Sequence, residues 1–412
     1  MQAKPRRRFL AAVGDSNNPV TWSGIPFHFL QAARAAGLLD EGLPLSTDGR
    51  VWQARRVAWN LSRVFKGDRR GGYQYSESFL ERLWRPVRNS VQGGIVVNCF
   101  QLFAPSIVRD QTVEKWFFID QTLQQLFDYY EQRPLIGRRI AHESIARERE
   151  GYHAARGIIV HSRWAARSVV NDYGVSPERV YTVMPGANID PTEYARWEKD
   201  EEQHRAANIE HEQRPLRLVF VGKYWHRKGL DRLLGALALA RRRGSLATLR
   251  VIGCRRETLP AHLRNTEGVE WSGFLDKRNE AHAFLCALGE CDIGCLLSRA
   301  EAGGIAFREY HALGLPVIGT DTGGAPDHML PGASVIVSTN STDEEISRII
   351  MDLERDGARL KALRKSARQQ RHLALWDETV RKIKLIWADC AEDDSNSQPL
   401  ERERQAQYQI QL

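Results

Sequence analysis

The chain of 412 residues carries 59 Lys and Arg against 51 Asp and Glu, a formal charge of +8. This length is ample for two core-forming domains, and the moderate positive charge suits an anionic substrate, a membrane surface or nucleic acid without choosing among them. No apolar run reaches the roughly 20 residues of a transmembrane helix. The six cysteines include no Cys-x-x-Cys pair, which favours buried, reduced thiols. The apolar run after the first arginines, Phe9 to Val13, is too short for a signal peptide, so we expect a cytoplasmic protein.

The first 39 residues have a pattern typical of the opening of a Rossmann-like half. A strand is predicted for Arg8 to Val13, a loop rich in turn formers for Gly14 to Gly24, and a helix for Phe27 to Leu39. The loop lacks the G-x-G-x-x-G fingerprint, so a dinucleotide site is not indicated.

Residues 51–90 are rich in arginine and tryptophan and contain a basic amphipathic helix. Its apolar face carries Val57, Leu61, Val64 and Phe65, and most charges lie elsewhere. We favour an ordinary domain helix with this face in the core and its arginines in solvent. Contact with an anionic membrane is the second interpretation, and nucleic-acid binding is the least favoured. A bilayer-binding surface here would use Trp52, Arg55, Arg56, Trp59, Arg63 and Lys66.

The middle of the chain continues the alternation of buried strands and helices. Asp120 lies at the carboxyl end of one predicted strand, Trp116 to Ile119. The histidines of this region form no ligand set, so we expect no metal site. The other predicted elements are strands at Gly94 to Phe100, Gly157 to His161 and Val180 to Met184, and a helix from Arg163 to Tyr173 capped by Ser162.

A second α/β pattern begins after a strongly charged segment, residues 191–214, which is predicted to be a linker or a surface helix within it. A buried strand, Leu216 to Val221, leads into the loop G-K-Y-W-H-R-K-G and a helix from Leu230 to Arg242. Two cations in this loop, Lys223 and Lys228, precede a glycine at the head of the helix, an arrangement that favours an anion site. The loop does not match G-x-x-x-x-G-K-[ST], so an ATPase is not indicated.

The stretch from Ser298 to Gly324 is predicted to form a loop, a helix, a strand and a second glycine loop. Both loops should meet at the carboxyl edge of a parallel sheet, where open α/β sheets bind ligands. The free amides of Gly303, Gly304 and Ile305 at the helix start suit a diphosphate. The carboxylates of Glu301 and Glu309 would repel phosphate, so each more plausibly accepts hydrogen bonds from sugar hydroxyls.

These motifs resemble those of the family 4 retaining glycosyltransferases, which have the GT-B fold of two Rossmann-like domains. The resemblance implies that Glu301 contacts donor-sugar hydroxyls and Glu309 the ribose, while the amides after Glu301 take the diphosphate or the sugar. It places Lys223 and Lys228 on the diphosphate, with the adjacent Arg227 carrying less weight.

The resemblance extends to four more positions. It places Gly24 in a loop that faces the donor phosphate and the acceptor, and Phe274 and Leu275 in a segment that flanks the nucleotide base. Asp120 stands where that family often has a histidine beside the donor sugar, a departure from its pattern. We therefore expect Glu301, Lys228 and Asp120 at the reacting centre.

The fold class expected from the resemblance is α/β, with two parallel sheets facing across a cleft and a last helix that crosses back to the first domain. The predicted domain boundaries are 1–190 for the acceptor-side domain, 191–214 for a charged linker, 215–374 for the nucleotide-sugar-binding domain, 375–391 for the crossover helix and 392–412 for a polar tail.

The activity that the resemblance implies is transfer of a hexosyl-type sugar from a nucleotide diphosphate donor, with retention, to a glycan, a lipid-linked sugar or a small molecule. Such a role fits polysaccharide biosynthesis at the inner face of the membrane. No metal or other cofactor is expected, because the lysines and helix amides can stabilise the diphosphate and no D-x-D lies between strands. The alternatives are a sugar-nucleotide epimerase or phosphorylase on the same fold, or a non-catalytic membrane- or nucleic-acid-binding protein.

Overall fold

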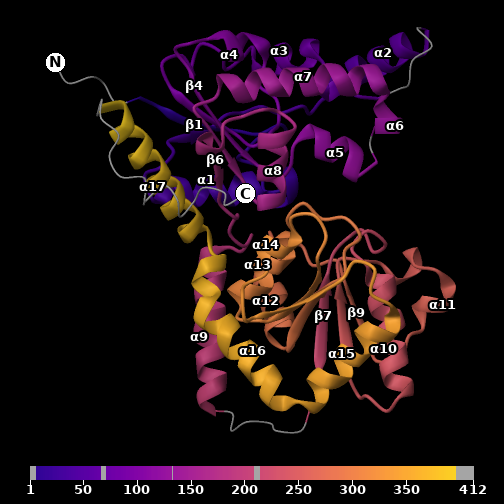
Figure 1. The fold of residues 1–412 in the computed structure, drawn as a ribbon. Helices are drawn as coiled ribbons and strands as arrows, with labels where there is room; N and C mark the ends of the chain where they lie inside the picture. Colours follow the sequence, from indigo (N-terminus) through magenta and orange to yellow (C-terminus); the bar gives the residue numbers. More distant parts are fainter. Residues whose placement is uncertain (1–5, 66–70, 132, 208–213, 396–412) are drawn as a thin grey trace. The chain divides into compact units, whose positions relative to one another are not determined.

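The computed structural model describes residues 6–65, 71–131, 133–207 and 214–395. They form two α/β units, each with its own parallel sheet and hydrophobic core (Figure 1). Unit 1 comprises the residues up to Met184 and from Thr379 onward, and unit 2 runs from Pro185 to Glu378. The predicted class, α/β with two Rossmann-like domains, is confirmed.

The sheet of unit 1 is parallel, and its strands within the described residues follow the order β2-β1-β3-β4-β5-β6. Helices cover both faces: Phe117 packs edge-on against Tyr152 of α7, and Phe118 stacks on Phe29 of α1. Strands buried on both sides need apolar residues at nearly every position, which is why these strands appear as continuous apolar runs. The strands are β1 (Arg8–Ala11), β2 (Glu41–Gly42), β3 (Ile95–Asn98), β4 (Glu114–Ile119), β5 (Gly157–Val160) and β6 (Val180–Thr182).

The helices of unit 1 fill the connections between these strands. The α-helices are α1 (Ile25–Ala35), α2 (Arg50–Phe65), α3 (Glu77–Trp84), α4 (Pro105–Arg109), α5 (Leu123–Tyr129), α6 (Arg133–Ile136), α7 (Arg138–Ala154) and α8 (Arg163–Asn171). Three 3-10 helices accompany them within the described residues: η1 (Thr21–Gly24), η2 (Tyr73–Tyr75) and η3 (Pro177–Arg179).

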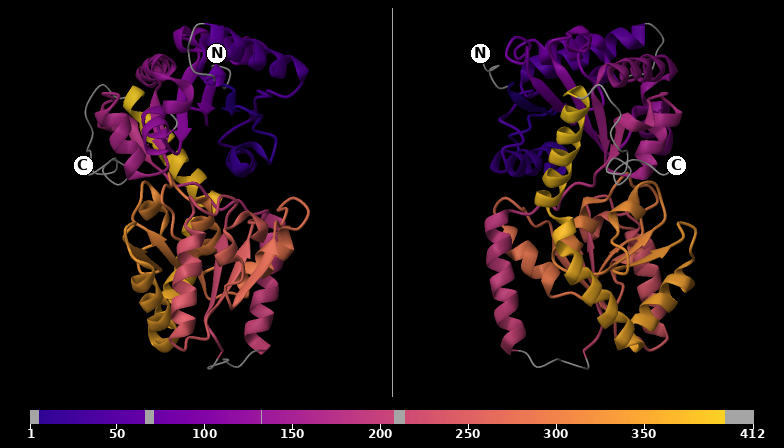
Figure 2. Two further views of the ribbon diagram at one scale, coloured as in Figure 1. Left: turned by 90° about the vertical axis from the view of Figure 1, so that its right-hand side faces the viewer. Right: turned by 60° about the vertical axis from the view of Figure 1, so that its left-hand side comes forward.

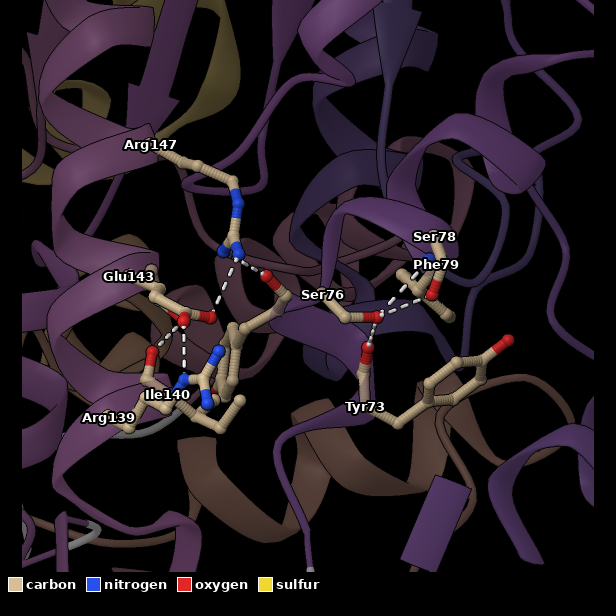
Figure 3. A network of polar contacts seen from close by, with 10 residues as sticks. Tyr73, Ser76, Ser78, Phe79, Arg139, Ile140, Glu143 and Arg147 are labelled. Atoms are coloured by element: carbon tan, nitrogen blue, oxygen red, sulfur yellow. Dashed lines mark hydrogen bonds and ion pairs between the residues drawn. The ribbon is translucent and has the colours of Figure 1, made fainter. Parts of the chain in front are cut away.

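A polar network joins α7 to the segment that precedes α3 (Figure 3). Arg147 donates a hydrogen bond to the carbonyl of Tyr75 at 2.8 Å and pairs with Glu143 at 3.5 Å. The hydroxyl of Ser76 accepts the amide of Phe79 at 3.2 Å and so caps α3. These contacts fix η2 and the start of α3 relative to α7.

Helix α2 is turned the opposite way from the favoured prediction. The face expected in the core is exposed: Val57 is 58% exposed, Leu61 53% and Phe65 88%. Arg63, expected in solvent, is 6% exposed and lies over the ring of Trp59. The prediction was wrong because the tryptophans, rather than the aliphatic residues, carry the contacts with the core of unit 1. Lys66, the last of the basic residues named above, lies outside the described residues.

Unit 1 also contains most of the last helix, α17 (Trp376–Ser395). Trp387 packs against Trp116 of β4 with ring centroids 5.7 Å apart, and Arg156 donates to the carbonyl of Cys390 at 2.7 Å. The chain therefore returns from unit 2 to the sheet of unit 1 through this helix. Of the predicted polar tail, residues 392–395 continue α17 and the rest lie outside the described residues.

The sheet of unit 2 is also parallel, in the order β12-β11-β10-β7-β8-β9 over the described residues. Helices flank these strands on both sides in the views of Figure 2. The order is that of the doubly wound nucleotide-binding folds, in which the first and fourth strands lie side by side. The strands are β7 (Arg217–Val221), β8 (Thr248–Ile252), β9 (Val269–Gly273), β10 (Ile293–Leu296), β11 (Val317–Thr320) and β12 (Ser334–Val337).

The segment predicted as a linker contains helix α9, which belongs to unit 2. Trp197 is 4% exposed within the core of this unit and packs closely against Gly289 of α12. One buried tryptophan thus anchors an otherwise charged helix. The helices of unit 2 are α9 (Pro191–Ala207), α10 (Leu230–Arg242), α11 (Ala261–Arg264), α12 (Ala281–Gly289), α13 (Ile305–Ala312), α14 (Ala325–His328), α15 (Asp343–Arg355) and α16 (Gly357–Gln370), with 3-10 helices η4 (Arg256–Thr258) and η5 (Arg371–Ala374).

A buried carboxylate locks the beginnings of two neighbouring strands of unit 2. Asp292, 4% exposed just before β10, accepts the amide of Arg217 at the start of β7 at 2.8 Å. It also pairs with Arg214 and with Arg364 of α16, both at 2.7 Å. Two cations and one amide therefore satisfy a charge that would be costly to bury alone.

We predict that Asp292→Asn lowers the free energy of unfolding of unit 2 by about 2–4 kcal/mol, because the two guanidinium groups lose their shared partner. The value lies below that of a fully buried pair because both arginines reach solvent. Urea unfolding, with hydrogen exchange followed at β7 and β10, measures the effect. Asp352→Asn, at an exposed position of α15, is the matched control. Equal stability of the two variants would contradict the prediction.

Candidate functional site

The strand order of unit 2 places a switch point between β7 and β10. The chain leaves β7 toward β8 on one side and returns to β10 on the other, so the loops after these two strands diverge at the carboxyl edge. These loops are residues 222–229 and 297–304. They are joined by the amide of Arg299, which donates to the carbonyl of Arg227 at 2.8 Å. The two loops, which were identified from separate sequence motifs, therefore contact each other at the carboxyl edge of the sheet.

Ion pairs connect the two loops through Glu301. Its Oε2 lies 3.2 Å from Lys228 Nζ and 3.2 Å from a guanidinium nitrogen of Arg227. Burial raises the pKa of this carboxyl, but the charges of Lys228 and Arg227 outweigh burial and hold the pKa below its ordinary value. Glu301 is therefore an ionised hydrogen-bond acceptor next to two cations. Arg227, given less weight from the sequence, contributes as closely as Lys228.

Glycine is required where the first loop enters α10. Gly229 has a φ of +69°, and a Cβ there would lie 1.9 Å from the carbonyl oxygen of Leu297. Only a residue without a side chain allows the loop to pass this close to the end of β10. Lys228 is thereby held beside Glu301.

The loop after β10 ends at α13, whose N-cap is Gly304 in the left-handed conformation. The amides of the first helical turn have no partner within the helix and form the positive end of its dipole. The prediction that the loop before α13 meets the glycine loop after β11 is confirmed, because the amide of Gly324 donates to the carbonyl of Glu301 at 3.0 Å. A Cβ on Gly303 would lie 2.8 Å from the imidazole of His328, a residue that the sequence reasoning did not single out.

The second carboxylate, Glu309, lies inside α13 and is 1% exposed. Its Oε1 pairs with Lys277, in the loop after β9. Within the part of the chain that the structure describes, its Oε2 is buried without a hydrogen-bond partner. Lys277 was missed from the sequence, although its position three residues after Phe274 could have indicated it.

The loop after β9 also brings Phe274 next to the first glycine loop. Lys223 Nζ lies 4.7 Å from the centroid of the Phe274 ring, a cation–π distance. Phe274 is 56% exposed, whereas Leu275 packs against the core of unit 2. The loop after β9 therefore contacts the first glycine loop through Phe274 and Lys223, and contacts α13 through Lys277 and Glu309.

Gly24 and Asp120 belong to unit 1, and the structure does not group them with the residues above. Gly24 is buried, has a φ of +89° and caps α1, directly after two residues with positive φ, Trp22 and Ser23. Asp120 follows β4 at the carboxyl edge of the sheet, and its charge adds to burial in raising the pKa of the Cys99 thiol. Their roles remain predictions.

Among the described residues, no group of three or more His, Cys, Asp or Glu side chains is arranged to hold a metal ion. None of the helices in this part of the chain is long and apolar enough to cross a membrane.

Residues 200–370 match the family model described as Glycosyl transferases group 1. This range contains the loops 222–229 and 297–304 and the carboxylates of Glu301 and Glu309. The chain carries a Glycosyl transferases group 1 domain.

The curated relatives of the chain have glycosyltransferase names. It is 26% identical to the D-inositol 3-phosphate glycosyltransferase 1 of Catenulispora acidiphila over 262 residues, 60% of each chain. It is 24% identical to the D-inositol 3-phosphate glycosyltransferase of Corynebacterium glutamicum over 250 residues, 58% of each. The match thus spans about 60% of the length of these relatives.

Solved structures show that the fold of the chain is GT-B. Sucrose-phosphate synthase of Thermosynechococcus elongatus aligns with a TM-score of 0.63 at 14% identity, over 94% of this chain and all of the other. HepE of Anabaena, in complex with UDP and glucose, aligns with a TM-score of 0.58 at 14% identity, over 93% and 100%.

We predict that Gly229→Ala lowers the free energy of unfolding by about 2–4 kcal/mol, because the methyl group overlaps the Leu297 carbonyl and the left-handed φ adds strain. Differential scanning fluorimetry of the purified chain measures the loss of stability as a fall in the melting temperature. Gly244→Ala is the matched control, since Gly244 has a φ of +91° with no atom within 4 Å of its Cβ position. A loss no larger than that of the control would show that the loop has room to move.

Proposed function

We propose that the chain is a retaining glycosyltransferase of the family 4 type, which transfers a sugar from a nucleotide diphosphate donor to a hydroxyl acceptor. The observation that carries the proposal is the cluster of Lys228, Arg227 and Glu301 at the switch point of the unit 2 sheet. It combines cations for a diphosphate with an ionised carboxylate for sugar hydroxyls. Either group alone would suit many ligands, whereas the pair suits a sugar joined to a phosphate.

The donor is assigned to unit 2. Lys228, Lys223 and the first amides of α13 would bind the diphosphate, and Glu301 would accept hydrogen bonds from the transferred sugar. Glu309 would accept from the ribose with its buried Oε2. Phe274 and Leu275 would flank the base. Uracil is the first base to test, since HepE was solved with UDP.

In the reaction, the bond between the anomeric carbon and the β-phosphate oxygen breaks, and negative charge grows on the leaving diphosphate. Lys228, Lys223 and the α13 amides would stabilise this charge most strongly in the transition state. The oxygen of the acceptor hydroxyl forms the new glycosidic bond, and its proton passes to the departing diphosphate. Retention rests on the resemblance to family 4, and no side chain is assigned as a nucleophile.

The acceptor is assigned to unit 1, with Gly24 and Asp120 as the residues proposed to contribute there. The relatives named D-inositol 3-phosphate glycosyltransferases make an inositol phosphate the first acceptor to test. The other acceptors to test are glycans, lipid-linked sugars and other small hydroxyl compounds.

Replacing Glu309 by Gln should weaken nucleotide binding by about 1–3 kcal/mol while the fold is kept, because a charged acceptor of ribose hydroxyls is lost. Isothermal titration calorimetry with UDP, GDP and ADP measures the change and identifies the base. Unchanged affinity for the nucleotide that binds the wild-type chain would refute the ribose assignment.

The control for this experiment is Glu344→Gln, which removes a carboxylate from the exposed side of α15. Its nucleotide affinity should equal that of the wild type. If none of the three nucleotides binds the wild-type chain, the proposed donor class is wrong.

Transfer activity should survive EDTA, because the cations and helix amides of the protein supply the charge that a metal ion provides in D-x-D enzymes. The transfer activity is measured as release of nucleoside diphosphate from the donor, with and without EDTA. A strict requirement for Mg²⁺ or Mn²⁺, restored by adding the metal back, would show that the protein's own charges are insufficient.

A further inference from the structure

Helix α2 presents an apolar face to solvent and its larger aromatic residues to the interior. Val57, Leu61 and Val64 follow one another at helical spacing on one side, and Phe65 lies beside them. Their exposed fractions are 58%, 53%, 46% and 88%, and Val51 in the first turn is 64% exposed. No other segment of the described chain exposes as many large apolar residues over so short a span.

The orientation of α2 is fixed by contacts on its inner side. Trp52 packs against Phe79 with centroids 5.2 Å apart, and Trp59 packs against Tyr73 at 5.7 Å. The indole of Trp59 also donates to the carbonyl of Gly71 at 2.8 Å. Rotating the helix to bury its aliphatic face would break these contacts, so the exposed face is a stable property of unit 1.

Positive charge accompanies the apolar face. The helix contains Arg50, Arg55, Arg56 and Arg63 and no acidic residue, and Asp48 is the acidic residue just before it in the sequence. Arg50 and Arg56 are exposed. A helix with an exposed apolar face and cationic side chains is complementary to an anionic lipid surface, where aliphatic groups enter the acyl boundary and arginines meet the headgroups.

We propose that α2 docks unit 1 on an anionic lipid bilayer, lying in the plane of the membrane with Val57, Leu61, Val64 and Phe65 inserted. The proposal concerns lipid binding and does not depend on the sugar donor. It reverses the order of the two leading sequence interpretations, because the face expected in the core is the one that is exposed.

Charge and burial weigh against the other occupants of this face. An isologous contact with a second copy would bring arginines of α2 against the same arginines, and the helix has no carboxylate to pair with them. Nucleic acid would need several exposed aromatic rings for stacking of successive bases, but Phe65 is the one exposed ring of this helix, and Trp52 and Trp59 are half-buried against the core of unit 1. Neither alternative uses the aliphatic face as well as a lipid surface does.

The test is co-sedimentation of the full chain, without nucleotide, with phosphatidylcholine vesicles containing 0 to about 40% phosphatidylglycerol. Binding should rise with the anionic fraction and fall with added salt, because surface attraction is screened beyond about 8 Å at physiological ionic strength. An apolar-face variant, Leu61→Gln with Val64→Thr and Phe65→Ser, should lower the partition coefficient at least roughly tenfold. A charge variant, Arg50→Gln with Arg56→Gln, should also lower it by roughly tenfold.

Matched controls come from unit 2. Leu246→Gln with Ile336→Thr removes apolar groups that are 63% and 52% exposed, and Arg242→Gln with Arg243→Gln removes two exposed charges. These variants should bind vesicles like the wild type. All changed residues are exposed, so the melting temperature of each variant should remain within about 2 °C of the wild type.

Arg63 is excluded from the charge variant, because it is buried and its loss would disturb the fold. Absence of wild-type binding to anionic vesicles, or equal losses in the unit 2 controls, would overturn the proposal. Sedimentation-velocity ultracentrifugation tests for the remaining outcome, which is self-association of the chain through this face. Self-association that the apolar-face variant abolishes, without vesicle binding, would identify the face as an interface between copies and would also overturn it.

Discussion

The ion pairs of Glu301 with Lys228 and Arg227 join two loops whose residues are 73 and 74 positions apart in the chain. A buried carboxylate is stable as an ion only where cations or donors surround it, so the loops after β7 and β10 must keep their relative positions. The parallel sheet provides this placement by setting the ends of these strands side by side. Gly229 and Gly304 then allow the backbone to approach closely enough for the charges to meet. The backbone hydrogen bonds from Arg299 to Arg227 and from Gly324 to Glu301 depend on this arrangement.

Much of unit 2 could be predicted because its signals are local. The helix predicted from Leu230 to Arg242 has these bounds in the structure, since a glycine precedes it and the apolar period is unbroken. The loops 222–229 and 297–304 were predicted for the same reason, since each lies between a buried strand and a helix that are adjacent in the sequence. Lys277 was not, because its role depends on a contact with Glu309, 32 residues further along the chain. Helix α9 gave only a weak signal within a charged segment, since its two aromatic anchors, Tyr194 and Trp197, are too few to make a periodic apolar pattern.

Helix α2 shows a different limit of sequence reasoning. Helical spacing established correctly that Val57, Leu61 and Val64 share a face, but the period of a helix gives only the angle between faces and not which one turns inward. That choice is made by tertiary contacts, here the packing of Trp52 and Trp59 on aromatic rings of η2 and α3. Whenever both sides of a helix can bury apolar surface, the side with larger rings has the greater gain.

Glu309, to which we assign the ribose in the proposed function, is already desolvated in the folded chain. Its Oε1 has an ammonium partner, which keeps a nearly fully buried carboxylate from being isolated, while its Oε2 has no partner within the described residues. The desolvation of this oxygen is therefore already a cost of the folded state. A ligand hydroxyl that donates to Oε2 gains a hydrogen bond to a charged acceptor without having to strip water from it. The contact with Lys277 also links the loop after β9 to α13, so a ligand bound between Glu309 and Phe274 would meet two segments already held together. Such preorganisation favours binding because little freedom remains to be lost.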